Sequence, residues 1–277
     1  MSDTTYFKDT KPHYKLLDSL RGVAALMVIW YHIFEGYAFA GALNGATDGS
    51  ITTFNHGYLA VDFFFMLSGF VISYAYDNRW SSMGILQFFK RRLVRLHPML
   101  IMGAIIGAAA FFVGGCTNWA GENIAPRFLF MALILAIFFI PAYGGAPYDV
   151  RGNGEMFPLN GPSWSLFFEY IGNILYAIFI RRLSTRWLKL FTAILGISFI
   201  IFATTNASGY GNIGVGWTLD TTNFFGGLLR MLFPFTLGML LQRTQAIKYL
   251  KKPLPQRATF WICTIALFAI FSVQFLG

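Results

Sequence analysis

The sequence predicts an all-α fold, a polytopic bundle of transmembrane helices. Of its 277 residues, 56% are hydrophobic and only 12% are charged, whereas soluble domains contain about 25% charged residues. Seven apolar segments approach the length of about 20 residues that a helix needs to cross the hydrocarbon layer. They are residues 20–40, 57–76, 98–115, 163–180, 187–203, 224–241 and 259–276. No soluble stretch is evident at either end, so we expect one integral membrane domain over residues 1–277.

An eighth apolar run, Phe128 to Ile140, contains only 13 residues before Pro141. This length suits a re-entrant or interfacial segment better than a full crossing. If the run does not cross, four basic clusters that hold 18 of the 21 lysines and arginines fall on one side of the membrane. The clusters are residues 8–21, 79–95, 181–189 and 243–257. The positive-inside rule makes that side cytoplasmic, so we expect seven crossings, a cytoplasmic N-terminus and a long outer stretch from about Cys116 to Pro162.

The net charge of +9 reflects these clusters, which flank apolar runs. This pattern indicates membrane topology rather than a surface for nucleic acid. The two cysteines, Cys116 and Cys263, exclude a disulfide scaffold and a multi-cysteine metal site. No two histidines have metal-ligand spacing, so we expect no metal. The first apolar run is too long for a cleavable signal peptide, so we expect the N-terminus to be retained.

Ionisable residues inside the predicted spans are costly and indicate function by default. They include His32 and Glu35 in the first span, Asp62 in the second, Glu169 in the fourth and Arg230 in the sixth. At 1.5 Å per residue, His32 lies roughly 12 Å from the outer end of its span and the other four roughly 8–9 Å. These residues therefore form one predicted acid–base layer near the outer face. The alternative is that each holds helices together or extends to the surface.

Four cations stand within six residues on the predicted cytoplasmic side: Lys90, Arg91, Arg92 and Arg95. Guanidinium groups suit phosphate, and the i, i+3 spacing of Arg92 and Arg95 predicts that both face one side. Positive-inside anchoring is the alternative interpretation. Together with the acid–base layer, this cluster suits transfer of a substrate or a chemical group across the bilayer.

Four sequence blocks, in order, resemble the acyltransferase-3 family of integral membrane acyltransferases. The first is an Arg-x10-His signature formed by Arg21 and His32. The others are residues 60–70 (AVDFFFMLSGF), 89–98 (FKRRLVRLHP) and 161–169 (GPSWSLFFE). Arg-x10-His alone is a weak signal, but four ordered blocks over residues 17–180 are specific, whereas residues 181–277 agree only in being hydrophobic.

The resemblance implies an enzyme of the plasma membrane, here a bacterial inner membrane. It would move an acyl group, usually acetyl, from cytoplasmic acyl-CoA to a hydroxyl of a cell-envelope carbohydrate such as a polysaccharide, an O-antigen or a lipid-linked sugar. His32 is then the expected catalytic residue, and the pair Arg92 and Arg95 is associated with acyl-CoA. Family members are commonly longer, so the resemblance also implies that this chain is truncated at its C-terminus.

Our mechanistic hypothesis makes His32 the general base toward the acceptor hydroxyl, because imidazole titrates near physiological pH and can return the proton to the leaving thiolate. A carboxylate is expected to orient the imidazole. Glu35, Asp62 and Glu169 are the candidates. Glu35 is at i+3 from His32, and side chains at i and i+3 on a helix lie side by side rather than head to head. We therefore favour Asp62 or Glu169.

The remaining site residues are assigned to the two substrates. Arg91, Arg92 and Arg95 are expected to bind the phosphates of CoA. Arg21 either pairs with Asp18 as an anchor or contacts a phosphate or the thioester carbonyl. For the acceptor, the expected contacts are Trp164, Ser163 and Arg230, although Trp164 also fits an ordinary interfacial aromatic.

Ser68 next to Gly69 indicates close helix packing rather than a nucleophile, since no Gly-x-Ser-x-Gly turn surrounds it. A proton-coupled transporter or exporter of an envelope precursor would use similar intramembrane residues. It would also show inverted repeats with broken helices, which this sequence lacks. An inactive, truncated family member is the third interpretation. The expected partners are the bilayer, acyl-CoA and a carbohydrate acceptor, and the oligomeric state stays open.

Overall fold

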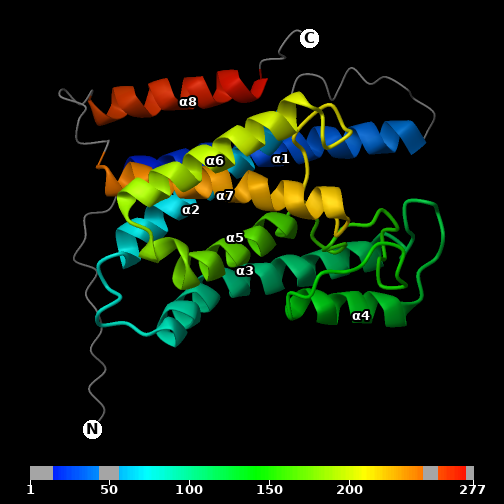
Figure 1. Ribbon diagram of the computed structural model, residues 1–277. Helices are drawn as coiled ribbons and strands as arrows, with labels where there is room; N and C mark the ends of the chain where they lie inside the picture. Colours follow the sequence, from blue (N-terminus) through cyan, green and yellow to red (C-terminus); the bar gives the residue numbers. More distant parts are fainter. Residues whose placement is uncertain (1–14, 44–55, 246–254, 273–277) are drawn as a thin grey trace. The chain divides into compact units, whose positions relative to one another are not determined.

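The computed structural model describes residues 15–43, 56–245 and 255–272, and every regular element among them is helical (Figure 1). This confirms the predicted all-α fold. The α-helices are α1 (Lys15–Leu43), α2 (Ala60–Tyr76), α3 (Ile85–Val113), α4 (Pro126–Ile137), α5 (Ser163–Ile178), α6 (Thr185–Thr204), α7 (Thr221–Arg243) and α8 (Gln256–Ser272), with short 3-10 turns η2 (Gly57–Leu59) and η3 (Ile180–Arg182).

Within the described residues, four helical segments are long and apolar enough to cross a membrane, judged by length and composition. They are Gly57–Tyr76, Ile85–Val113, Thr185–Thr204 and Thr221–Arg243. The short run around residues 128–140 forms α4, which has 12 residues and a length of about 18 Å at 1.5 Å per residue. That is well below the hydrocarbon thickness of about 30 Å. The count of seven crossings and the re-entrant role of α4 stay predictions.

Helix α3 begins 13 residues before the predicted span 98–115, and it continues through Pro98. The apolar run starts late because charged residues interrupt it, but lysine and arginine are good helix formers and do not end a helix. The four cations at residues 90–95 therefore lie on α3 itself.

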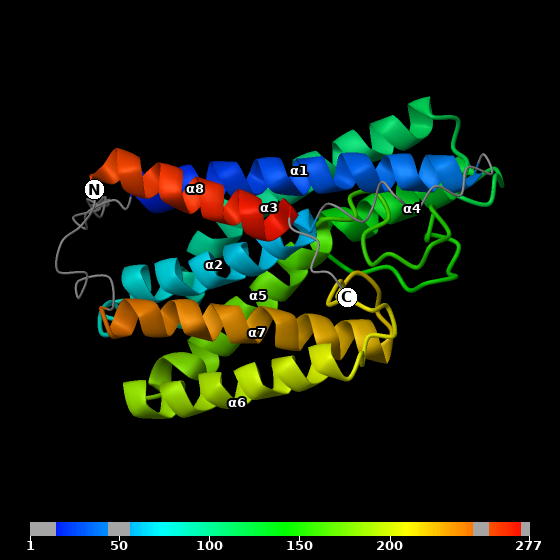
Figure 2. The ribbon, with the colours of Figure 1, turned by 90° about the horizontal axis from the view of Figure 1, so that it is seen from above.

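The described chain forms two compact units, and the boundary falls within α2 between Phe64 and Phe65. In the first unit, α1 packs against η2 and α8. Ala24, Met27 and Ala60 are buried at the centre of this packing. Trp30 of α1 stacks on Phe268 of α8 with ring centroids 5.5 Å apart, and Figure 2 shows these two helices side by side. Unit 1 is thus organised around α1.

The second unit, residues 65–250, is built around α7. Helix α7 packs against α6 and α5, and α3 packs against α4 and α5 (Figures 1 and 2). A Cβ atom on Gly69 of α2 would lie 1.9 Å from the Phe235 carbonyl oxygen, and one on Gly238 of α7 would lie 1.9 Å from the Met66 carbonyl oxygen. Small residues let helix backbones approach closely in membranes. The predicted packing role of Gly69 is therefore confirmed.

A hydrogen-bonded cluster around Asp77 joins the ends of α2, α5 and α7. Arg243 Nε donates to Asp77 Oδ2 over 2.7 Å, and the Tyr176 hydroxyl donates to Asp77 Oδ1 over 2.7 Å. Ser73 Oγ lies 2.6 Å from Asp77 Oδ2, and Arg243 also donates to the Leu183 carbonyl. Charge-assisted bonds of this kind are among the stronger ones, so the cluster fixes this end of unit 2.

At the opposite ends of these helices, the segment between α4 and α5 folds around Asp149, which is 6% exposed. Its carboxylate accepts hydrogen bonds from the backbone N–H groups of Gly145, Gly152 and Gly154. The Met156 N–H donates to a carbonyl in the α6–α7 connection. The segment between α4 and α5, which belongs to the predicted outer stretch, is therefore held in a defined conformation by these hydrogen bonds.

Replacing Gly69 by alanine should destabilise unit 2 by about 1–3 kcal/mol, because the added methyl group overlaps the α7 backbone. Gly22 of α1 is the matched control, since a Cβ atom there meets nothing within 4 Å. Gly22→Ala should be neutral or stabilise the protein by up to about 1 kcal/mol through helix propensity. The free energies of unfolding can be compared by SDS titration in mixed micelles. Equal effects of the two substitutions would contradict the close α2–α7 contact.

Asp220 caps the N-terminus of α7, and its side chain accepts a hydrogen bond from the Asn223 N–H. Desolvation raises the pKa of this carboxyl, but hydrogen bonds from Thr218, Asn223 and Thr222 outweigh it and hold the pKa below the ordinary aspartate value of 3.8. A lowered folded-state pKa stabilises the fold at pH values above 3.8, and the contribution is lost as the pH falls through the folded-state pKa. Asp220→Ala should therefore cost about 1 kcal/mol at neutral pH and progressively less in acid.

Thermal unfolding in detergent at pH 7 and at acidic pH measures this difference. Asp220→Asn is the control, since asparagine caps helices about as well as aspartate and carries no titrating carboxyl. A pH-independent gap between wild type and Asp220→Ala would argue against the ionised cap.

Candidate active site

A histidine–carboxylate pair lies on α1 in unit 1. His32 Nδ1 is 2.8 Å from Glu35 Oε2, and the Tyr31 hydroxyl donates to Glu35 Oε1 over 3.2 Å. The side chains of His32 and Glu35 are 39% and 37% exposed. When Nδ1 carries the proton it donates to Glu35, and Nε2 then presents its lone pair. A histidine base and a carboxylate that orients it would need a contact of this geometry.

Glu35 contacts His32, although its position at i+3 was expected to make it a poorer partner than Asp62 or Glu169. Side chains at i and i+3 lie on one helix face, and the imidazole Nδ1 is near enough to its own backbone for a glutamate one turn away to reach it. Glu169, one of the two favoured candidates, belongs to unit 2, where it bonds to Arg92 and Ser68. Asp62 is half-buried in the first turn of α2.

Arg21 NH1 lies 2.7 Å from Asp18 Oδ1, which confirms the predicted pairing across one helical turn. Arg21 is three turns from His32 along α1, so the two side chains act at separate points.

Unit 2 contains a buried ion pair between α3 and α5. Arg92 NH2 lies 2.6 Å from Glu169 Oε1, and their side chains are 4% and 19% exposed. Ser68 Oγ of α2 donates to the same carboxylate oxygen over 2.7 Å. Three helices therefore converge on Glu169.

Two predictions about these residues were wrong. Arg92 and Glu169 were expected at opposite sides of the membrane, but they are in contact because α3 extends further toward the N-terminus than the apolar run indicates. Arg92 and Arg95 were expected to face one side, yet Arg92 is 3% exposed and Arg95 is exposed. Arg92 and Arg95 lie about 60° apart around the helix axis, and this offset lets Arg92 bond to Glu169 of α5 while Arg95 stays exposed.

Two of the predicted acceptor residues come together in unit 2. The Arg230 guanidinium lies 5.3 Å from the centroid of the Trp164 ring, within the range of a cation–π interaction. Arg230 is 1% exposed and donates to the Val215 carbonyl. Ser163, the first residue of α5, is 3% exposed. Arg230 therefore supports Trp164 from inside the fold.

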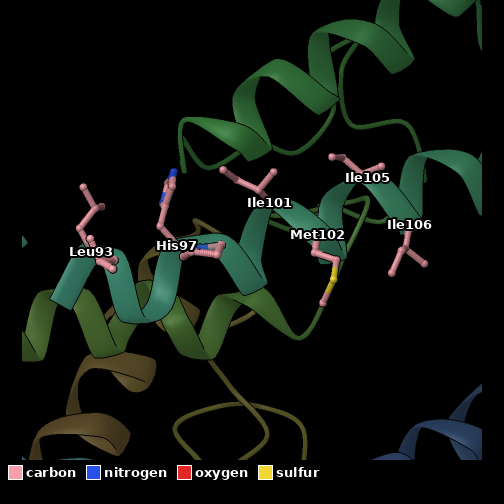
Figure 3. Close-up of a pocket in the computed structure, with 8 residues that line it drawn as sticks. Leu93, His97, Ile101, Met102, Ile105 and Ile106 are labelled. Carbon is pink, nitrogen blue, oxygen red and sulfur yellow. The ribbon is translucent and has the colours of Figure 1, made fainter. Parts of the chain in front are cut away.

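One side of α3 carries an open apolar groove of about 550 Å³ (Figure 3). Its lining residues are Leu93, Val94, His97, Pro98, Ile101, Met102, Ile105 and Ile106. The groove offers almost no hydrogen-bonding groups, so it suits hydrocarbon rather than phosphates or sugars. It contains none of the predicted site residues.

Sequence reasoning missed two contacts of the site. The first is the hydrogen bond from the Tyr31 hydroxyl to Glu35. The spacing of Tyr31 and Glu35, one helical turn apart, could have predicted it. Ser68 was read only as a packing residue, and nothing in its local sequence indicates a glutamate that is 101 positions away.

Comparison with known proteins agrees with the resemblance seen in the sequence. Residues 14–277 match the family described as the acyltransferase domain, acyltransferase-3. Protein 2 in the picA locus of Rhizobium radiobacter is 33% identical over 196 residues, which are 68% of this chain and 93% of that protein. Acyltransferase MdmB of Streptomyces mycarofaciens is 27% identical over 165 residues, which are 60% of this chain and 38% of MdmB.

The peptidoglycan O-acetyltransferase OatA of Listeria monocytogenes is 30% identical over 118 residues, which are 40% of this chain and 16% of OatA. The matches thus span most of the first relative but well under half of the other two. No solved structure matches. With the helical fold, the apolar helices and a family match over nearly the whole sequence, the chain belongs to the acyltransferase-3 family of integral membrane acyltransferases.

Proposed function

We propose that this protein is an O-acyltransferase that moves an acyl group, most simply acetyl, from acyl-CoA to a hydroxyl of a cell-envelope carbohydrate. The observation that carries this proposal is the 2.8 Å contact between His32 Nδ1 and Glu35, a base–orienter pair in a member of an acyltransferase family. The printed name of OatA, a peptidoglycan O-acetyltransferase, supports the acceptor class.

In the proposed reaction, Nε2 of His32 takes the proton of the acceptor hydroxyl as its oxygen attacks the thioester carbonyl. The C–S bond then breaks, and the imidazolium returns the proton to the CoA thiolate, so the products are an ester and CoA thiol. Glu35 holds the imidazole tautomer and stabilises its charged form. Tyr31 fixes the carboxylate in turn. Asp62 stays the second candidate for contact with the imidazole.

The donor is proposed to bind from the cytoplasm, where the N-terminus also lies in the orientation that we predict for a bacterial inner membrane. Lys90 and Arg95 are exposed and Arg91 is half-exposed, and these three cations are the proposed contacts of the CoA phosphates. Arg92 is buried and paired with Glu169, so we propose that it lies beside the donor site rather than binding the phosphates. Arg21 is proposed to contact a donor phosphate, since it lies three turns away from His32 and the thioester carbonyl.

The acceptor is proposed to stack on Trp164 near the N-terminus of α5. Its ring packs against Phe65 of α2 with centroids 6.2 Å apart, and Arg230 supports it. A ring held on two sides keeps a fixed orientation, as recognition of a planar sugar face requires. Ser163 sets the start of α5, since its N–H donates to the Asn160 carbonyl.

His32→Ala should lower acyl transfer by at least about 100-fold, because general-base catalysis contributes about 10²–10⁴-fold. Glu35→Gln should lower it by at least about tenfold, since the wrong imidazole tautomer is then favoured. Mass spectrometry of envelope glycans from a deletion strain that expresses each variant measures the O-acyl ester.

Glu122→Gln is the matched control, because Glu122 is an exposed carboxylate that bonds only locally to Asn118. It should leave ester formation at the wild-type level. Transfer by His32→Ala, present in the membrane at normal abundance, would remove His32 from the mechanism. If deletion of the gene abolished polymer export and left the esters on residual polymer intact, the protein would be an exporter instead.

The two arginines of the Arg-x-x-Arg pair should behave differently. Arg95→Gln should weaken acyl-CoA binding and leave stability unchanged, because the side chain is exposed. Arg92→Gln should destabilise the protein by about 3–5 kcal/mol, since it leaves the Glu169 charge uncompensated. Calorimetric titration with acetyl-CoA and SDS unfolding separate the two effects. Equal stability loss in both variants would contradict the distinct environments.

A further inference from the structure

Three side chains near the Arg92–Glu169 pair carry buried polar atoms with no hydrogen-bond partner in the described part of the chain. They are Arg92 Nε, the Tyr170 hydroxyl oxygen, and both amide atoms of Asn173. Asn173 is 1% exposed. A buried polar group left unsatisfied costs about 1–3 kcal/mol, and buried polar groups almost always have a partner. An amide with neither its donor nor its acceptor satisfied indicates a partner from outside the chain.

The position of Asn173 brings these atoms together. On α5 it lies one turn after Glu169 and one turn before Tyr176, so all three share a face. On α3, Arg92 bonds to Glu169 over 2.6 Å, and the ring of Phe88, one turn away, lies 5.7 Å from the Tyr176 ring. Asn173 therefore faces the turn of α3 between Phe88 and Arg92.

Tyr170 stands one turn before Asn173 and is close enough to Arg92 and Glu169 to interact electrostatically with both. The unsatisfied atoms of Arg92, Tyr170 and Asn173 thus line one stretch of the α3–α5 interface.

The chemistry of these groups favours a neutral ligand. The charge of Arg92 is already compensated by Glu169, so a phosphate group would gain little electrostatic binding energy here. The planar carboxamide of Asn173 offers one acceptor and two donors, which match the N–H and C=O of a secondary amide. Arg92 Nε and the Tyr170 hydroxyl are further donors suited to a carbonyl.

The pantetheine arm of CoA has this chemistry, because two secondary amides separate its phosphates from its thioester. Lys90, Arg91 and Arg95, the proposed phosphate contacts, lie within about one turn of Arg92 on the same helix. A chain held by phosphates at these cations reaches the amide-lined stretch next.

We infer that Asn173, Tyr170 and Arg92 bind the amide groups of the pantetheine arm of acyl-CoA. This inference rests on the proposed function, in which acyl-CoA is the donor. It adds a neutral subsite, specific for amides, to the cationic one that binds phosphates.

The test compares two ligands on full-length protein in detergent by isothermal titration calorimetry. Acetyl-CoA contains the pantetheine arm, and 3′,5′-ADP contains phosphates without it. Asn173→Leu, which is close to isosteric, should weaken acetyl-CoA binding about tenfold, as expected for loss of one to two hydrogen bonds. Binding of 3′,5′-ADP should not change.

Thr192→Val is the matched control, since Thr192 is a buried polar residue of the same unit that bonds to its own helix. It should leave both affinities unchanged. Tyr170→Phe removes only the hydroxyl and should weaken acetyl-CoA binding severalfold with 3′,5′-ADP unaffected. This variant decides the question where Asn173→Leu does not fold.

The outcomes separate the two proposals. If the wild-type protein does not bind acetyl-CoA, the proposed donor is wrong. If the wild type binds it and the variants bind both ligands as the wild type does, water satisfies these atoms and the amide subsite is overturned. Equal weakening for both ligands would also overturn it, because the residues would then act on the phosphate site or on the fold.

Discussion

The buried pair of Arg92 and Glu169 is the constraint on which unit 2 depends. Moving such charges out of water costs several kcal/mol per ion, and only close geometry with further hydrogen bonds offsets that cost. The pair meets this condition with a 2.6 Å contact and a second bond from Ser68. Because the residues come from α3, α5 and α2, satisfying one carboxylate sets the relative positions of three helices. Separation of α3 from α5 would leave both charges without compensation in a medium of low dielectric constant.

Other polar groups of unit 2 follow the same rule at its two ends. Asp77 accepts hydrogen bonds from side chains of α5 and α7. Asp149 accepts hydrogen bonds from three backbone N–H groups, and Asp220 caps the N-terminus of α7. Between these ends, the helices meet through backbone contacts at Gly69 and Gly238. The unit thus combines close apolar packing along the helices with carboxylates that organise each connection. Asn173 departs from this pattern, since its amide is one of the buried polar groups that have no hydrogen-bond partner in the described part of the chain.

Hydropathy predicted the helices well, because the apolar length needed for a span is a local property of the sequence. The predicted span 187–203 corresponds to Thr185–Thr204, and 57–76 corresponds to Gly57–Tyr76. The start of α3 could not be found in this way, since cations extend a helix without extending its apolar run. The contacts within the site depend on information that hydropathy lacks. Glu169 meets Arg92 through the packing of α3 on α5, and His32 meets Glu35 through side-chain rotamers, so spacing identified the residues but not their partners.

The length of α3 has a consequence for how the protein sits in the bilayer. Its 29 residues extend about 43 Å at 1.5 Å per residue, whereas the hydrocarbon layer is about 30 Å thick. The excess is accommodated by tilting or by extending the helix beyond the hydrocarbon. Extension at the N-terminal end would place Lys90 and Arg91 at the level of the lipid headgroups. Further along α3, Gly103 and Gly107 lie against Asn160 and Leu159 of the segment before α5. The tilt of α3 would then depend on the local bilayer thickness. Because α3 connects the cationic end of unit 2 to the segment before α5, a change in tilt would move these two ends relative to the membrane.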